Sequence, residues 1–266
     1  MKHYNRVLTI AGSDSGGGAG VQADIKTISA HGCYASSAIT AITVQNTLGV
    51  KGVHPVPVDF IEQQIEAVLE DIGADAVKIG MLHSEEVVKC VARMLKKYGC
   101  KNVVLDPVMV STSGHRLIEE EAINSLMTEL LPIATVITPN IPEAEILLGG
   151  RVLDKQSDLY DSAKELGMKF GTSVLLKAGH LTENKLVDIF YNHEDGSITE
   201  LPSIRINTKN THGTGCTMSS AFASMLAKGC GLVDAAKGAK EYINNAIIAG
   251  AEYEIGHGHG PVKHFE

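Results

Sequence analysis

The nine residues from Gly12 to Gly20 read G-S-D-S-G-G-G-A-G and directly follow an apolar run that is typical of a strand. A glycine-rich turn between a strand and a helix is where doubly wound proteins bind anions or dinucleotides. The spacing does not fit G-x-G-x-x-G, because Val21 stands where the last glycine is needed, and the turn has no lysine for a P-loop. We therefore expect a backbone that a ligand approaches closely, because so many glycines are costly in a plain flexible turn, which is the alternative interpretation.

The segment T-H-G-T-G-C-T, from Thr211 to Thr217, precedes a long stretch of small residues that is typical of a helix. Gly213 and Gly215 leave unpaired backbone N–H groups near the helix N-terminus, where the helix dipole adds positive potential. This pattern predicts an anion hole for a phosphoryl group in transfer. Cys216 falls in the first turn, a position that lowers a thiol pKa from about 8.5 toward neutrality and suits a base or a nucleophile. The alternative is a small buried residue that only fills space.

Polar residues stand where three predicted strands end. Asp106 follows one apolar run, Asn140 and Glu143 follow the next, and Lys177 follows a third. In open α/β sheets, ligands bind at the carboxyl ends of the strands. Oxygen ligands from neighbouring strand ends could hold Mg²⁺ on phosphates, and a lysine there could neutralise phosphate charge. The alternative is that strand ends are polar because the chain leaves the core there.

The elements that must position these residues alternate between strand and helix along the whole chain. The predicted strands are Arg6–Ala11, Ile39–Val44, Ala76–Ile79, Val103–Asp106, Val136–Thr138, Val174–Lys177, Leu186–Tyr191 and Ser197–Leu201. The predicted helices are Val21–His31, Val58–Asp71, one from the Ser84 cap to Gly99, Glu120–Leu131, one after Pro142, Asp158–Phe170, Cys216–Lys228 and Val233–Ala251. This order predicts an α/β fold with a mostly parallel sheet, helices on both faces and a late antiparallel hairpin at one edge.

Charge and length exclude several classes of protein. Acidic residues outnumber basic ones, 31 to 23, for a formal net charge of −8, so we expect neither a nucleic-acid partner nor an anionic membrane surface. No apolar run approaches the ~18–20 residues of a membrane helix, and Met1–Thr9 lacks the pattern of a signal peptide. With no linker and no repeat, residues 1–266 are predicted to form a single domain.

The cysteines and the histidine-rich end point to no metal centre. The five cysteines are odd in number and show no metal-ligand spacing, so we expect a reduced, cytoplasmic protein. His257, His259 and His264 lie in a glycine-rich tail without an acid or cysteine to complete a ligand set. A packed or disordered tail is the favoured interpretation.

Taken together, these segments resemble the ribokinase-like superfamily, and within it the hydroxymethylpyrimidine and phosphomethylpyrimidine kinases of thiamine biosynthesis. The resemblance spans essentially the whole chain. The motifs that carry it are IAGSDSGGGAGVQAD (Ile10–Asp24), TVQNT (Thr43–Thr47), VKIGML (Val77–Leu82), LDPVMV (Leu105–Val110), TPNIPEAE (Thr138–Glu145) and THGTGCT (Thr211–Thr217).

The resemblance implies a three-layer ribokinase-like sandwich that uses ATP and Mg²⁺ to phosphorylate 4-amino-5-hydroxymethyl-2-methylpyrimidine (HMP), and then HMP phosphate. It also implies a homodimer. Cys216 stands where the wider superfamily has an aspartate base. Gln45 is implied as the hydrogen-bonding partner of the aminopyrimidine ring.

The remaining roles follow from motif positions in the same resemblance. The implied substrate-binding residues beside Gln45 are Gly12, Asp24, Thr43, Met81 and Val108. The implied phosphate and nucleotide contacts are Thr211, Gly213, Thr214, Gly215, Asn140 and Lys177, with Asp106 and Glu143 toward Mg²⁺. The segment Ser111–Arg116 departs from the Lys- or Gly-rich stretch of many relatives, which bears on loop contacts to phosphate and on the second phosphorylation.

Three other functions compete with this one. Pyridoxine or pyridoxal kinases resemble this chain closely in the same motifs, and a dual activity stays open. A dinucleotide-dependent oxidoreductase is disfavoured by the glycine spacing. A silent ligand sensor on a kinase scaffold is disfavoured because Asp106, Glu143, Lys177 and Cys216 are all present, and no basic helix-turn-helix segment supports a DNA-binding regulator.

Overall fold

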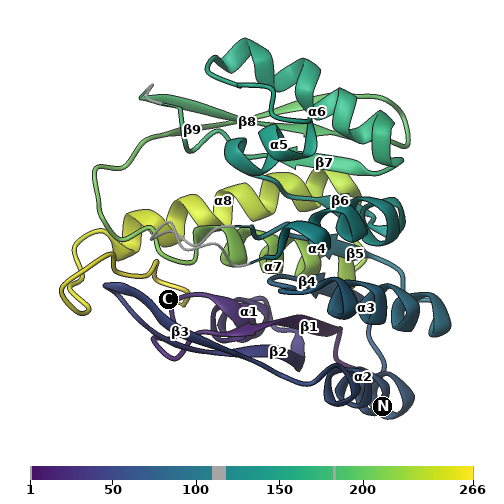
Figure 1. Cartoon of the computed structure of the whole chain (residues 1–266). Coiled ribbons are helices and arrows are strands. Elements are labelled where there is room, and N and C mark those ends of the chain that lie inside the picture. Colours follow the sequence, from purple (N-terminus) through teal and green to yellow (C-terminus); the bar gives the residue numbers. More distant parts are fainter. Residues whose placement is uncertain (1, 110–117, 182–183, 266) are drawn as a thin grey trace.

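A nine-stranded sheet runs through the centre of the molecule (Figure 1) in the order β3-β2-β1-β4-β5-β6-β7-β8-β9. The structure is a computed structural model that describes residues 2–109, 118–181 and 184–265. The strands are β1 (Arg6–Ser13), β2 (Tyr34–Asn46), β3 (Gly49–Pro55), β4 (Ala76–Ile79), β5 (Val103–Leu105), β6 (Val136–Ile137), β7 (Ser173–Leu176), β8 (Lys185–Tyr191) and β9 (Ile198–Ile204). The five neighbouring pairs from β2 to β7 are all parallel, while β3 pairs antiparallel with β2, β8 with β7, and β9 with β8.

Helices cover both faces of this sheet, as the alternation of elements predicts. One face carries α1 (Gly20–Ala30), α7 (Thr214–Ala227) and α8 (Leu232–Gly250). The other carries α2 (Val58–Ala67), α3 (Glu85–Lys97), α4 (Glu120–Ser125), α5 (Ile141–Leu147) and α6 (Gln156–Phe170). These three layers confirm the predicted ribokinase-like α/β class, including the late hairpin of β8 and β9.

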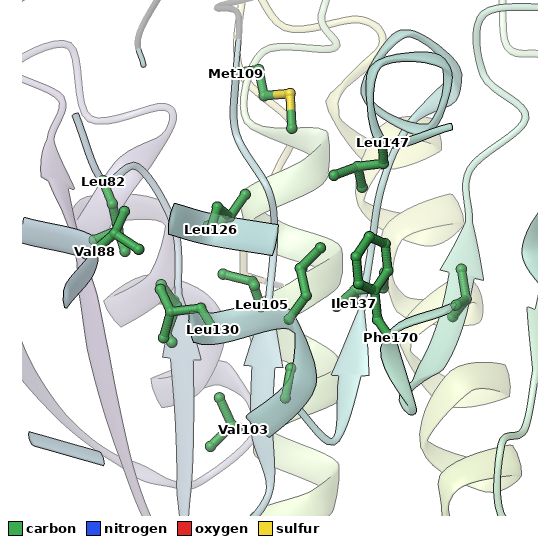
Figure 2. Packing of buried hydrophobic residues seen from close by; sticks show 14 of the residues in the cluster. Leu82, Val88, Val103, Leu105, Met109, Leu126, Leu130, Ile137, Leu147 and Phe170 are labelled. Carbon is green, nitrogen blue, oxygen red and sulfur yellow. The ribbon is translucent and has the colours of Figure 1, made fainter. Parts of the chain in front are cut away.

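The central strands are apolar at successive positions because each face packs against its own core. In β5, Val103 and Leu105 join the cluster beneath α2–α6, whereas Val104 joins the cluster beneath α1, α7 and α8. Figure 2 shows the first cluster, where Leu105 of β5 and Ile137 of β6 lie among side chains such as Leu130 and Phe170. Burial on both faces is what makes a central parallel strand an unbroken apolar run.

The sequence analysis missed β3. Gly49–Pro55 contains two glycines, and of its seven residues only Val50 is buried, so the segment lacks the alternation that identifies a half-buried strand. It pairs antiparallel with a β2 that is longer than the predicted Ile39–Val44. Both edges of the sheet are therefore antiparallel, not only the one at the late hairpin.

Two predicted helices end in widened turns. The helix predicted over Val58–Asp71 is α-helical to Ala67 and continues as a π-helical turn, Val68–Ile72. The helix predicted over Glu120–Leu131 divides in the same way after Ser125. Among the helices within the described ranges, none is long and apolar enough to cross a bilayer.

Candidate active site

A cavity of about 1010 Å³ lies at the carboxyl ends of the central strands. The chain passes from β1 to β2 on one side and later returns to β4 on the other side of β1. Open α/β sheets bind ligands at such a reversal, because the loops on the two sides diverge there. The cavity volume is at the upper end of the usual range for small-molecule sites, which leaves room for two ligands.

The buried side chain of Asp14 organises the glycine-rich turn after β1. Its carboxylate accepts hydrogen bonds from the backbone N–H groups of Gly16, Gly18 and Ala19, at 2.8, 3.1 and 2.8 Å. A ring nitrogen of His212 lies 2.9 Å from the same carboxylate. Burial acts to raise the pKa of Asp14, but these partners outweigh it and lower the pKa below its usual value. The turn is therefore a fixed loop built around an anion.

Gly213 and Gly215, at the N-terminus of α7, both lie in close contact with their surroundings. Gly213 has φ of +78°, and a Cβ there would lie 1.8 Å from the carbonyl oxygen of Gly18. A Cβ on Gly215 would lie 3.2 Å from Lys177 Nζ and 3.3 Å from an Asp106 carboxylate oxygen. The helix begins at Thr214, and residues Gly213 to Cys216 line the cavity together with Lys177. This is the arrangement that the anion-hole prediction requires.

The thiol of Cys216 does not behave as predicted from its helix position. Burial, together with the nearby carboxylates of Asp24 and Asp106, raises its pKa to about 11, although Lys78 and the backbone N–H of Gly20 act to lower it. The prediction of a pKa near neutrality was wrong, because desolvation outweighs the helix N-terminus here. At neutral pH the thiol is protonated.

Asp24 lies beneath the cavity and does not line it. Its carboxylate is fully buried, forms an ion pair with Lys78 at 2.8 Å, and accepts hydrogen bonds from the hydroxyls of Thr9 and Ser220 at 2.6 and 2.8 Å. Lys78 borders the cavity in its place. Asp24 therefore does not border the cavity as predicted, whereas its ion-pair partner Lys78 does.

Lys177, Asp106 and Thr138 form a polar cluster at the ends of β5, β6 and β7. Asp106 accepts hydrogen bonds from Lys177 Nζ and from the Thr138 hydroxyl, both at 2.9 Å. Burial opposes ionisation of Asp106, yet Lys177 and Lys78 together hold the pKa of this carboxyl below its usual value. The cluster thus carries a fixed negative and a fixed positive charge beside Gly215.

Asn140 and Glu143 hold the start of α5. The Asn140 side chain accepts from the backbone N–H of Glu143 at 3.0 Å, and the Glu143 carboxylate accepts from the N–H of Asn140 at 2.8 Å. This reciprocal capping box, with the sequence N-I-P-E from Asn140 to Glu143, was not recognised in the sequence. Burial raises the pKa of Glu143 to about 7; Lys177 opposes this shift and the Asp106 carboxylate adds to it.

The structure brings together every predicted site residue except Asp24. The predicted residues that line the cavity are Gly12, Thr43, Gln45, Met81, Asp106, Val108, Asn140, Glu143, Lys177, Thr211, Gly213, Thr214, Gly215 and Cys216. The segment Ser111–Arg116 lies outside the described residues. Sequence reasoning missed Lys78, Asp14 and His212, and a lone lysine within the apolar strand β4 was a signal that could have found the first of them.

The C-terminal tail packs against this site. The backbone of His212 pairs with the tail through Gly260 and Val262, at 3.0 and 3.4 Å, and His264 is 3% exposed. Burial lowers the pKa of His264 to about 4. Within the described ranges, no cluster of three His, Cys, Asp or Glu side chains could hold a metal, and all five cysteines, each of them described, are unpaired.

Comparison with known proteins identifies the family to which this chain belongs. The family model described as phosphomethylpyrimidine kinase matches residues 14–263. The chain belongs to the phosphomethylpyrimidine kinase family. It is 46% identical over 258 residues to a hydroxymethylpyrimidine/phosphomethylpyrimidine kinase of Rhizobium meliloti strain 1021, which covers 97% of this chain and 96% of that protein.

Solved structures include members of this family and pyridoxal kinases. The phosphomethylpyrimidine kinase of Clostridium difficile 630 matches with a TM-score of 0.80 at 44% identity, covering 91% of this chain and 99% of that one. The pyridoxal kinase of Bacillus subtilis, in an ADP complex, matches with a TM-score of 0.88 at 38% identity, covering 98% of both chains. The fold alone therefore does not separate pyrimidine kinases from pyridoxal kinases.

Proposed function

We propose that this chain transfers the γ-phosphoryl group of ATP to the hydroxymethyl group of HMP, and then phosphorylates HMP phosphate, in thiamine biosynthesis. The observation that carries the proposal is a cavity lined both by Gln45 and by the glycine-rich N-terminus of α7. Family membership supports the kinase reaction, and the names of the relatives support the substrate. The ADP complex of the related pyridoxal kinase supports the nucleotide.

In the proposed reaction the hydroxymethyl oxygen forms a bond to the γ-phosphorus while the bond from that phosphorus to the bridging oxygen of ADP breaks. The N–H groups of Gly213, Thr214 and Gly215 hold the equatorial oxygens, and Lys177 shares their charge. Phosphoryl transfer of this kind depends mostly on positioning and electrostatics. The minor thiolate form of Cys216 takes the hydroxyl proton, or the thiol orients the hydroxyl through its sulfur.

Mg²⁺ is part of this proposal, and the residues present fit it. Asp106 and Glu143 both line the cavity near Lys177, and burial, with a smaller contribution from the Asp106 carboxylate, raises the pKa of Glu143, so a cation there would favour its ionised form. Magnesium in kinases is usually held by one or two carboxylates together with substrate phosphates and water. The ion would neutralise phosphate charge there, while Asn140 and the capping box fix the orientation of Glu143.

The substrate end of the cavity suits a small, flat ring. Met81 and Val108 supply apolar contacts, and Thr43 and Gln45 supply polar ones. A Cβ on Gly12 would lie 2.9 Å from the terminal carbon of Met81. Position 12 therefore has no space for a side chain in the part of the cavity that would hold the ring. An amide offers both a donor and an acceptor, which matches the edge of an aminopyrimidine.

A pyridoxine or pyridoxal kinase is the second candidate, favoured by the high structural similarity to the Bacillus subtilis pyridoxal kinase. The B6 compounds also carry a hydroxymethyl group on a six-membered heterocycle. The fold and the phosphoryl-transfer chemistry would be the same, and only the ring that Gln45 contacts would differ.

Coupled ADP release with ATP and Mg²⁺ tests the proposal on HMP and HMP phosphate, with Gln45→Ala as the variant. Removing the amide leaves ring polar groups unpaired at a cost of about 1–3 kcal/mol, so KM for HMP should rise roughly tenfold or more. Turnover of HMP phosphate reports the second step. No turnover of either pyrimidine by the wild type, with turnover of B6 compounds, would assign the second candidate instead.

We also propose a cytoplasmic homodimer formed by one domain, residues 1–266. The unpaired cysteines are consistent with a reducing compartment. Ile42 and Val44 of β2 are 52% and 61% exposed close to the sheet edge, which offers an apolar surface for self-association. Light scattering of the purified protein would measure the mass, and a monomer at micromolar concentration would refute the dimer.

A further inference from the structure

The side-chain amide of Gln45 lies between two polar groups, the His212 ring and the Thr43 hydroxyl. Its Nε2 position lies 3.3 Å from Nε2 of His212, and its Oε1 position lies 3.2 Å from the Thr43 hydroxyl. The backbone of Gln45 is held as well, since Ser15 Oγ donates to its carbonyl and accepts from its N–H, at 2.7 and 2.9 Å. The amide therefore has little freedom other than a half-turn that exchanges its oxygen and nitrogen.

The His212 ring requires a hydrogen-bond acceptor from the Gln45 amide. Nε2 of His212 lies 2.9 Å from the Asp14 carboxylate, and an ionised carboxylate only accepts hydrogen bonds. Nε2 must therefore carry a proton, in the neutral ring as in the charged one. A protonated Nε2 has no lone pair to accept from an amide NH₂ and can only share its proton between Asp14 and Gln45, so the oxygen of Gln45 belongs on the His212 side.

The Thr43 hydroxyl requires a hydrogen-bond donor from the Gln45 amide. The Thr43 hydroxyl has one proton, and it donates that proton to the carbonyl oxygen of Ser13 at 2.8 Å. Toward Gln45 it can present only lone pairs, which attract an amide N–H. The amide NH₂ of Gln45 therefore belongs on the Thr43 side, and both neighbours agree on the same orientation, because amide oxygen and nitrogen are assigned from their partners.

The His212 ring is itself held in place. A Cβ on Gly18 would lie 2.5 Å from Cδ2 of His212 and 3.1 Å from Cβ of Pro261, so the ring packs directly against the glycine-rich turn. The backbone of His212 pairs with Gly260 and Val262 of the C-terminal tail. The tail, the turn and Asp14 together leave the ring one position, which is what a positioning residue requires.

We propose that Asp14, His212 and Thr43 act as positioning residues that lock the Gln45 amide with its oxygen toward His212 and its nitrogen toward Thr43, and that this lock sets substrate preference. The amide then directs one lone pair and one N–H into the cavity, side by side in a fixed order. This inference rests on the proposed function, and it specifies how the same site recognises its ring.

The complementary ring edge carries a donor next to an acceptor. In HMP the exocyclic amine is the donor and the adjacent ring nitrogen is the acceptor, so the amine faces the His212 side and the nitrogen the Thr43 side. In pyridoxine the ring nitrogen is flanked by carbon on both sides and offers no adjacent donor. The locked amide thus leaves its oxygen unpaired with a B6 ring, which is costly in a buried site.

The test compares His212→Leu, which removes the Nε2 donor, with His212→Gln, which places an amide donor near the same position. Each is assayed for kcat and KM on HMP and on pyridoxine, with thermal unfolding as the folding check. His257→Leu, which replaces an exposed histidine of the C-terminal tail, is the matched control. We expect His212→Leu to raise KM for HMP roughly tenfold with little change in kcat and to lower the HMP preference by about as much, whereas His212→Gln keeps most of it.

Thr43→Val provides an independent arm if His212→Leu fails to fold, with Thr43→Ser as its conservative partner. Thr43→Val should also raise KM for HMP and lower the preference, and Thr43→Ser should retain both. If the folded variants keep the wild-type preference, or lose activity on both substrates equally without rescue by the conservative change, the lock is refuted. If the wild type itself does not phosphorylate HMP, the proposed function fails instead, which is a separate result.

Discussion

Lys78 and Asp24 form an ion pair in which both side chains are 0% exposed, with Lys78 Nζ at 2.8 and 2.9 Å from the two carboxylate oxygens. The pair joins β4 to α1 near Cys216. Both of its charges act on the pKa of the Cys216 thiol: Lys78 lowers that pKa and Asp24 raises it. A buried pair is weak evidence for stability in itself, but breaking it by removing one partner is expensive. Its position points instead to a role in the electrostatics of the site.

Lys78→Met should therefore destabilise the protein by about 3–5 kcal/mol, because it leaves the Asp24 carboxylate buried without its counter-ion. The double variant Lys78→Met/Asp24→Leu should recover a large part of this loss. Urea unfolding measures both values. Arg93→Met, which breaks the exposed pair with Glu62, is the matched control and should change stability little. A single variant as stable as the control would contradict the importance of the buried pair.

Cys216→Ala should lower kcat for HMP by ~10²–10⁴-fold, the usual contribution of a general base, with little change in KM. Because the thiol pKa is raised to about 11, the thiolate fraction grows as pH rises. The rate with HMP should therefore climb through pH 7–10 without a plateau, and so should alkylation of Cys216 by iodoacetamide. In the second step the nucleophile is already an anionic phosphate oxygen, so that step should depend less on Cys216. A variant with a near-wild-type kcat would rule out the base.

Gly215→Ala should separate catalysis from stability. The added methyl group would lie 3.2 Å from Lys177 Nζ and 3.3 Å from Asp106, so the flexible lysine end must move away from the transferring phosphoryl group. We expect kcat to fall by roughly tenfold, since the lysine end must give by a few tenths of an ångström and a misplacement of about 1 Å can cost 10²-fold, while the melting temperature changes little. Gly213→Ala, at φ of +78° and 1.8 Å from a carbonyl oxygen, should instead fail to fold normally. Wild-type kcat in Gly215→Ala would contradict the anion hole.

Glu143 should make the response to Mg²⁺ and ATP dependent on pH. Its pKa is about 7 in the folded protein against about 4.3 when unfolded, so the folded state binds more protons across this window. Ionising the group as pH rises through it costs stability, and binding a cation removes that cost. The shift in melting temperature on adding Mg²⁺-ATP should thus be larger at pH 8 than at pH 6, and Glu143→Gln should reduce the difference. Equal shifts at both pH values would argue against Glu143 as a metal ligand.

The sequence was sufficient for most of the fold because the central strands are apolar throughout and helices separate them regularly. Ala76–Ile79 was predicted with the observed bounds, and Ser84 caps α3 as expected, accepting from the N–H of Val87. The edge strand β3 could not be predicted because its stability comes from pairing with β2 rather than from its own residues. The π-helical ends of two helices likewise depend on tertiary packing, which overrides local propensity.

The candidate site was predicted as a set of residues but not as an electrostatic environment. Motif positions placed fourteen of the fifteen named residues at one cavity. The error on Cys216 arose because burial depends on the whole fold, whereas a helix N-terminus is visible in the sequence. Asp24 was misplaced for the same reason, since only the structure shows Lys78 between it and the cavity.

The most direct test of the central claim is the ratio of kcat/KM for HMP to that for pyridoxine and pyridoxal, measured by coupled ADP release with ATP and Mg²⁺. We expect the pyrimidine to be preferred by ~10²-fold or more, since the locked Gln45 amide pairs fully only with an aminopyrimidine edge. A preference for either B6 compound would contradict the account. The fold and the phosphoryl-transfer chemistry would stand, and Gln45 would become a contact to a pyridine ring.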